Sequence, residues 1–183
     1  MVTKKTSTSP KSKKTTIKKS MTKISEKPFK NEIQIFEDFT DDEVKEIYEI
    51  AQRKKVKKNE VVFKEKSRDN AVYIVLKGKF EVLTEIPETG PIAFAEISEG
   101  HVFGEMSFLD GKPRSATVKA LNEGEILRIT RQGFNKLRIN SPEVATKFIS
   151  DLARIISLRL RTADEFIIEM LNILKSHSDS PKL

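Results

Sequence analysis

Residues 103–118 read Phe-Gly-Glu-Met-Ser-Phe-Leu-Asp-Gly-Lys-Pro-Arg-Ser-Ala-Thr-Val, and this stretch decides how the rest of the chain is interpreted. The stretch contains two glycines and a proline, and it places the acid Glu105 and the arginine Arg114 nine residues apart. A short helical turn that begins at a glycine offers free backbone amides, which suit a small anionic ligand when a cation lies nearby. The final Ala-Thr-Val predicts a strand directly after the arginine. The stretch therefore predicts a pocket made by a short helix and the following strand.

Short strands separated by glycine and proline surround this stretch. Between Val56 and Ile129 the apolar residues follow the period of a β-strand. The pattern predicts strands at 61–63, 71–76, 79–84, 92–97, 102–103, 117–120 and 125–129. Lys77-Gly78 predicts a two-residue hairpin between the second and third of these strands, because glycine supplies the positive φ that such a turn needs. About eight short strands at this spacing are typical of a sandwich or jelly roll.

Helical spacing precedes and follows the strands. Thr40-Asp41-Asp42-Glu43 has the sequence of a capping box and predicts a helix over 41–53, with a basic run, Arg53–Lys58, at its end. Thr130 predicts the cap of a short helix, and Ser141-Pro142 predicts the start of a longer one. The expected fold class is therefore α+β: an eight-stranded antiparallel β jelly-roll barrel with a short N-terminal helix and two C-terminal helices.

Apolar residues near the C-terminus repeat with the three-four spacing of a coiled-coil seam. They are Leu160, Ala163, Ile167, Met170 and Leu174. Two interpretations stay open. This part of the helix packs on its own β domain, or it pairs with the same helix of a second copy to form a homodimer.

The net charge of +7 belongs to one end of the chain. Residues 1–30 hold ten lysines and a single acid, Glu26, whereas the remaining residues hold 24 basic and 26 acidic side chains. Without periodic apolar residues, residues 1–30 are predicted to be a disordered tail. The tail either solubilises the protein or makes nonspecific contacts with a polyanion, because mobile lysines displace counterions from phosphates. The predicted organisation is this tail, one domain over 31–176 and a short tail over 177–183.

Several protein classes are excluded by what the sequence lacks. No apolar run approaches the roughly 18 residues of a membrane span, and no secretory signal is present, so a cytoplasmic location is expected. The chain has no cysteine, and its histidines are His101 and His177. Such a set assembles neither a metal site nor a catalytic triad, so we expect no enzymatic activity.

The order of elements and the residues of the opening stretch together resemble a cyclic nucleotide-binding domain, of the kind found in catabolite activator proteins and protein kinase A regulatory subunits. The resemblance covers residues 31–165 and is strongest in the phosphate-binding cassette of that family. The matching positions are Phe103, Gly104, Glu105, Met106, Ser107, Pro113, Arg114, Ser115, Ala116, Thr117 and Val118. The chain departs from the family at Lys66, where a glycine is common and where Asp69 and Asn70 supply the turn, and at His101, where an aspartate is common.

The resemblance implies a role for each cassette residue. Amides from Gly104 to Ser107 and the guanidinium of Arg114 would hold the cyclic phosphate, and Glu105 would accept a hydrogen bond from the ribose 2′-hydroxyl. The ligand-binding residues expected are Gly104, Glu105, Met106, Ser107, Arg114, Ser115 and Ala116. The resemblance leaves cAMP and cGMP both open, with cAMP favoured. By spacing alone, Arg159, Thr162 and Phe166 are the candidates for contacts with the base.

Two functions follow from the resemblance. The first is a non-catalytic receptor that binds a cyclic nucleotide and relays its presence to a partner protein through the C-terminal helices. The alternative is an adaptor or dimerisation module of the same fold that has no ligand, in which Arg114 only pairs with Glu105 or with an aspartate. Catabolite activators continue into a DNA-binding domain, whereas only seven residues follow Ser176 here, so a stand-alone domain is expected.

Overall fold

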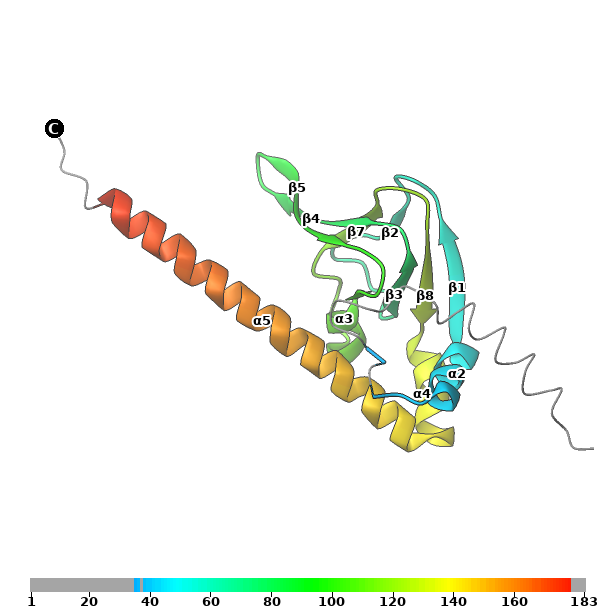
Figure 1. The fold of residues 1–183 in the computed structure, drawn as a ribbon. Coiled ribbons are helices and arrows are strands. Elements are labelled where there is room, and N and C mark those ends of the chain that lie inside the picture. Colours follow the sequence, from blue (N-terminus) through cyan, green and yellow to red (C-terminus); the bar gives the residue numbers. More distant parts are fainter. Residues whose placement is uncertain (1–34, 37, 179–183) are drawn as a thin grey trace, which may run out of the picture.

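A computed structural model of the chain describes residues 35, 36 and 38–178 (Figure 1). The predicted tail over 1–30 and the last residues, 179–183, lie outside the described residues. The strands are β1 (Ala51–Val56), β2 (Val61–Phe63), β3 (Val72–Lys77), β4 (Phe80–Ile86), β5 (Gly90–Ile97), β6 (Val102–Phe103), β7 (Thr117–Ala120) and β8 (Gly124–Ile129). The helices are α2 (Asp41–Ile50), α3 (Glu105–Asp110), α4 (Arg131–Asn140) and α5 (Pro142–Ser178).

The strands form two antiparallel sheets of four, and the class α+β is confirmed. Sheet A has the strand order β1-β8-β3-β6, and sheet B has the order β2-β7-β4-β5. Hydrogen bonding among the described residues keeps these two sheets separate, rather than closing all strands into the single barrel that the sequence predicted. The cassette helix α3 follows β6 at the edge of sheet A, and its Phe108 packs in the cluster between that sheet and the other helices.

Two apolar clusters occupy the two faces of sheet A. The cluster between sheet A and the helices contains Ile35, Ile47, Val72, Ile74, Val102, Phe108, Leu127, Ile129, Phe134, Leu137, Val144, Ala145, Phe148, Leu152 and Ile155. The cluster between the sheets contains Val56, Phe63, Ala71, Tyr73, Val75, Phe80, Ile97, Phe103, Val118, Ala120 and Ile126. The protein is therefore layered as helices, sheet A and sheet B, with α3 contributing Phe108 to the helical side.

The helix starts follow the sequence closely. Thr40 accepts a hydrogen bond from the amide of Glu43 while the Glu43 carboxylate accepts one from the amide of Thr40, so the capping box is confirmed. Thr130 accepts from the amide of Gly133, and α5 begins at Pro142, as predicted. Satisfying otherwise unpaired amides at these positions fixes where each helix begins.

The predicted helix over 41–53 is too long, because α2 ends at Ile50 and the chain turns extended at Ala51. The basic residues that follow form β1, the edge strand of sheet A, paired along its length with β8. The Arg53 guanidinium donates to the carboxylate of Glu125 on that neighbouring strand, with Nη2 2.7 Å from Oε2. Pairing with a strand more than 70 residues away thus outweighs the local preference of this basic run for a helix end.

The predicted hairpin at Lys77-Gly78 is wrong. The strand β3 pairs with β6 and β8 in sheet A, whereas β4 pairs with β5 and β7 in sheet B. Gly78 does have a positive φ of 98°, but its turn carries the chain from one sheet to the other. A glycine of this kind shows where the chain turns, and the pairing of the flanking strands depends on tertiary contacts.

The last helix, α5, has two different halves. Its first half is buried in the core through Val144, Phe148, Leu152 and Ile155. The second half of the helix extends away from the β domain, as Figure 1 shows in orange and red. None of the helices in the described residues is both long and apolar enough to cross a membrane.

Candidate functional site

Gly104 begins the cassette helix and brings the backbone against Arg114. It has a φ of 76°, in the left-handed region that favours glycine. A Cβ atom at this position would overlap the Arg114 guanidinium and would lie 3.1 Å from the carbonyl oxygen of Ala71. The carbonyl of Gly104 accepts a hydrogen bond from Nη1 of Arg114 at 2.8 Å. The first glycine of the stretch is therefore required by both its conformation and its neighbour.

The Arg114 guanidinium is buried, with 2% of the residue exposed. Its Nη2 donates to the carbonyl of Ala71 at 2.6 Å and to the carboxylate of Asp69 at 2.8 Å. The guanidinium also lies over the ring of Phe63, 4.0 Å from its centroid, where a cation is attracted by the aromatic face. Its buried Nε has no hydrogen-bond partner among the described residues. Arg114 is thus a fixed, desolvated cation whose Nε–H is not used by the described residues.

Asp69 organises the polar groups around Arg114. One carboxylate oxygen accepts from the Tyr73 hydroxyl at 2.6 Å, and the other accepts from the amide of Ala71 at 3.2 Å and from Arg128 at 3.5 Å. Burial by itself would raise the pKa of Asp69, but the hydrogen bonds from Tyr73 and Arg114 outweigh it and hold the pKa below its ordinary value. The carboxylate therefore stays ionised and balances the charge of Arg114.

Glu105 is the second buried charge of the site, with 5% of the residue exposed. Its Oε1 accepts a hydrogen bond from Nη1 of Arg159 on α5 at 2.6 Å. The other Arg159 nitrogen donates to the carbonyl of Val102 at the start of β6. The acid of the cassette is therefore held by the long C-terminal helix, which ties α5 to the start of α3.

The remaining predicted residues divide between the surface and the interior. Ser107 and Ala116 are buried, whereas Met106 is 51% exposed. The exposed hydroxyl of Ser115 donates to the Met106 sulfur at 3.8 Å. The structure thus brings together Gly104 with Arg114 and Met106 with Ser115, on the two segments that the sequence predicted to meet.

The candidates for base contacts are placed differently. Arg159 engages Glu105, a contact that its spacing did not indicate. The hydroxyl of Thr162 donates to the carbonyl of Leu158 in its own helix at 3.2 Å. The side chain of Phe166 lies outside the described residues. A role in base recognition for these positions stays a prediction.

Sequence reasoning missed Asp69 as the partner of Arg114 and assigned it only to a turn. It also missed Phe63 and Tyr73, whose rings lie 4.0 Å and 5.5 Å from the guanidinium carbon. These residues come from the segments before and after the turn that contains Asp69. By sequence, Glu105 or any of several aspartates could have paired with Arg114, and only the fold selects Asp69.

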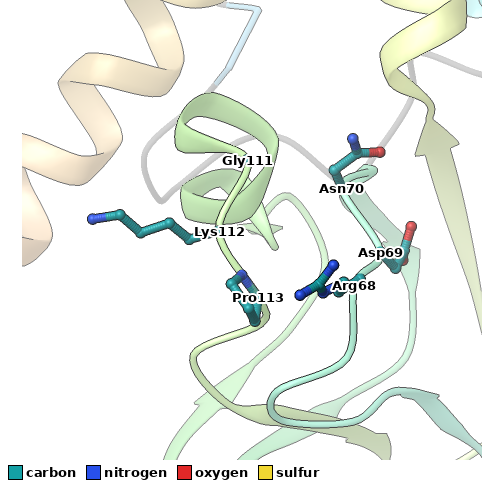
Figure 2. Close-up of a pocket in the computed structure, with 6 residues that line it drawn as sticks. All are labelled: Arg68, Asp69, Asn70, Gly111, Lys112 and Pro113. Atoms are coloured by element: carbon teal, nitrogen blue, oxygen red, sulfur yellow. The ribbon is translucent and has the colours of Figure 1, made fainter.

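A surface pocket of about 410 Å³ lies beside the cassette, between the C-terminal end of α3 and the turn before β3 (Figure 2). It is lined by Arg68, Asp69, Asn70, Gly111, Lys112 and Pro113. Among the predicted ligand-binding residues none lines this pocket, which touches the site only through Asp69. The Lys112 side chain points away from Arg68 in Figure 2, so the two cations do not converge on one point.

The charged groups of the site are a cation and a carboxylate rather than a cluster of metal ligands. Within residues 35–36 and 38–178, no group of three or more histidine, aspartate and glutamate side chains could hold a metal ion. The site instead offers one buried cation, one buried carboxylate and a short helix that begins at a glycine. Such groups recognise a small molecule that carries both an anionic group and a hydroxyl.

Residues 53–141 match the family model described as "Cyclic nucleotide-binding domain". The chain is similar to the solved structure of a cyclic nucleotide-binding domain from Methylobacillus flagellatus, with 26% identity and a TM-score of 0.69 over 74% of this chain and 76% of that chain. It is also similar to the catabolite activator protein of Thermus thermophilus, with 27% identity and a TM-score of 0.66 over 75% of this chain and 62% of that chain.

Among curated proteins, the chain is 30% identical over 125 residues to the lysophospholipase NTE1 of Chaetomium globosum. This match covers 68% of the present chain but 8% of the lysophospholipase. A match to an uncharacterized ABC transporter ATP-binding protein of Mycobacterium bovis, 33% identical over 81 residues, covers 44% of this chain and 24% of that protein. The chain therefore spans a minor part of the curated relatives that it matches.

Proposed function

Because residues 53–141 belong to the cyclic nucleotide-binding domain family, we propose that this chain is a non-catalytic receptor that binds a cyclic nucleotide and relays its presence to a partner protein. The proposed ligand is cAMP or cGMP. The lysophospholipase activity named for the Chaetomium globosum relative is not proposed for this chain, since the match covers 8% of that protein.

The unused donor of Arg114 is the observation that carries this proposal. Leaving a buried N–H without an acceptor costs about 1–3 kcal/mol, and the cost is larger for a charged group. The cyclic phosphate of a nucleotide has a negative charge and exocyclic oxygens that accept from a guanidinium. A ligand phosphate at Arg114 would satisfy the buried Nε, which has no partner among the described residues.

Glu105 supports the same ligand from the other side of the cassette. An ionised carboxylate accepts hydrogen bonds, so beside a phosphate it suits the sugar hydroxyl rather than the anion. The carboxylate already accepts from Arg159 of α5. A ribose that engages Glu105 therefore alters the contact that holds α5, and this change is the proposed route from ligand to partner.

Calorimetric titration tests the proposal with cAMP, cGMP and 2′-deoxy-cAMP, using adenosine 5′-monophosphate as a control. We expect one of the cyclic ribonucleotides to bind, and its deoxy analogue to bind roughly tenfold to a hundredfold more weakly, since a hydrogen bond to a charged group contributes about 1.5–3 kcal/mol. Ligand at a hundred times its Kd should raise the stability by about 2.7 kcal/mol. The absence of heat with every cyclic nucleotide would show that the receptor proposal is wrong.

Arg114→Lys is the matched variant for this titration. Lysine keeps the positive charge but lacks the planar fork that serves Gly104, Asp69 and a phosphate together. We expect this variant to remain folded and to lose most of its affinity for the nucleotide. Unchanged affinity in the folded variant would show that Arg114 does not bind the phosphate.

A ligand-free adaptor or dimerisation module remains the second candidate function, and two observations favour it. Asp69 neutralises Arg114 without any ligand. The outer half of α5 exposes large apolar residues, including Leu160, Ile167 and Leu171 at 61%, 54% and 60%. Exposed apolar side chains at this spacing suit a second helix, and the proposed occupant is α5 of a second copy.

The location proposed for the protein is the cytoplasm, as the sequence led us to expect. The lysine-rich tail over 1–30 is proposed to add a nonspecific contact with nucleic acid or another polyanion. Such a contact weakens steeply with added salt, because it rests on counterion release. Removing residues 1–30 should abolish it.

A further inference from the structure

The cassette helix α3 has only six residues, so its own hydrogen bonds cannot hold it in one orientation. A helix this short depends on contacts with the rest of the protein. Its first residue, Glu105, is held by Arg159 of α5. Its far end needs a second attachment, because the carbonyls of the last turn have no partner within the helix.

Arg131, the first residue of α4, makes that second attachment. Its Nη1 donates a hydrogen bond to the carbonyl oxygen of Phe108 at 2.7 Å. The same guanidinium lies over the Phe108 ring, 5.4 Å from the centroid. A cation at the C-terminal end of a helix is favourable both as a donor to free carbonyls and as a partner of the helix dipole.

The Phe108 side chain extends this attachment into the helical layer. The ring is fully buried and lies 5.4 Å from Phe134 of α4 and 6.3 Å from Phe148 of α5, edge to face with both. Arg131 thus binds the backbone of the residue whose side chain is packed between the two C-terminal helices. Moving α3 without moving α4 would break the hydrogen bond and the ring contacts together.

We propose that Arg131 is a positioning residue for the ligand site: by holding the carbonyl and ring of Phe108, it keeps α3 in the orientation that presents Gly104 and Glu105 to the ligand. This role rests on the proposed receptor function, and Arg131 itself contacts no ligand in it. A site that adopts the competent orientation only part of the time binds with its affinity reduced by that fraction.

Hydrogen exchange in the ligand-free protein tests the positioning role without reference to any nucleotide. The amides to follow are those of Phe108 and of the C-cap Gly111, which donate to the carbonyls of the N-cap Gly104 and of Ser107. Arg131→Gln should increase their exchange at least roughly tenfold, the loss expected for a hydrogen bond to a charged group. Arg131→Lys keeps a cationic donor but lacks the planar guanidinium, so its exchange rates should lie between those of Arg131→Gln and the wild-type protein.

Lys147→Met provides the matched control. Lys147, on α5, likewise joins its helix to another segment by a hydrogen bond and a ring contact: its Nζ lies 2.6 Å from the carboxylate of Glu43 on α2 and 5.6 Å from the ring centroid of Phe39, which precedes α2. This variant should leave exchange of the Phe108 and Gly111 amides unchanged. A general loosening of the fold would instead increase exchange in both variants to the same extent, and that result would overturn the proposal.

Titration with the cyclic nucleotide completes the test. Arg131→Gln should weaken binding by roughly tenfold, with Arg131→Lys partly restoring it and Lys147→Met binding as the wild-type protein does. The role of Arg131 would be overturned if the Phe108 and Gly111 amides exchanged in Arg131→Gln as slowly as in the wild-type protein. If Arg131→Gln does not fold, the same comparison is made with Arg131→Lys. If α3 loosens as expected but the wild-type protein binds no nucleotide, the receptor function is wrong and the positioning of α3 by Arg131 stands.

Discussion

A buried arginine that pairs with a turn aspartate dominates the chemistry of single side chains in this protein. Arg114 was identifiable from its place after glycine and proline, because the cassette sequence is specific. Its partner Asp69 was not, since 45 residues separate the two and several acids were available. Local sequence shows which residues carry charge, whereas the fold decides which of those charges meet.

The Asp69 carboxylate makes the stability of the protein depend on pH in the acid range. Its pKa is lowered in the folded protein, so its stabilising contribution is complete above about pH 4, the ordinary aspartate pKa, and is lost as the pH falls through the folded value. Asp69→Asn should therefore lower the free energy of unfolding by about 1.5–3 kcal/mol at pH 7. Urea unfolding of both proteins from pH 7 to pH 2.5 should show the difference shrinking below about pH 4.

Tyr73→Phe is the control for this pH dependence. It removes one donor to Asp69 and keeps the ring that packs against Phe63 and Phe103. The folded pKa of Asp69 should then move up toward its ordinary value, so the stability lost in acid should be smaller and the loss should be complete at a higher pH. A difference between wild type and Asp69→Asn that stays constant with pH would contradict the ionised hydrogen-bonded state of Asp69.

Among the secondary-structure elements, those fixed by local chemistry were predictable and those fixed by distant pairing were not. Thr40, Thr130 and Pro142 each begin a helix where the sequence predicted one, because capping involves neighbours in the chain. The strand β1 was missed because its lysines carry no apolar alternation and its pairing partner β8 lies far along the chain. The same limit explains the wrong hairpin at Gly78.

The close packing of the turn between the sheets can be tested by comparing Gly78, which lies in that turn, with Gly90, which lies at the start of β5 and also has a positive φ. Gly90 has a φ of 84° with no atom within 4 Å of an added Cβ, whereas at Gly78 that Cβ would lie 2.9 Å from the backbone of Gly124. Gly90→Ala should lower the free energy of unfolding by about 1–2 kcal/mol through backbone strain alone. Gly78→Ala should add overpacking of about 1–3 kcal/mol to that strain.

Chemical denaturation of the two alanine variants measures this comparison. The larger loss is expected at Gly78, because two of the three close atoms at that turn, in Glu123 and Gly124, belong to the backbone and cannot rotate away. Equal losses in the two variants would indicate that the turn between the sheets relaxes to admit a side chain.

At the level of the whole molecule, α5 leaves the domain with apolar residues exposed. The exposed Leu160 and Ile167 exclude the interpretation that this part of the helix packs on its own β domain. The side chains of Met170 and Leu174, which complete the predicted seam, lie outside the described residues. The helix pair therefore remains a proposal that rests on the residues from Leu158 to Leu171.

Sedimentation velocity tests the proposed helix pair. Ile167→Asp places a charge in the seam and should weaken a dimer by about 100-fold or more, because a buried unpaired carboxylate is strongly unfavourable. Thr162→Asp introduces the same charge on a neighbouring exposed position and should leave the dimer intact. A wild-type protein that sediments as a monomer at micromolar concentration, or equal behaviour of the two variants, would rule out pairing through this seam.

The pairing of β1 with β8 has a further consequence, for how the protein is made. Ala51 of β1 lies opposite Ile129 of β8. The backbone of β1 therefore has no pairing partner until β8 has been synthesised. On a ribosome that adds about 5–20 residues per second, β1 emerges several seconds before β8. During that interval its run of positive charges keeps the unpaired strand from joining neighbouring chains, as charged residues do on exposed strand edges. The same basic residues that hid β1 from sequence-based prediction should thus limit aggregation of the nascent chain until β8 is available to pair with β1.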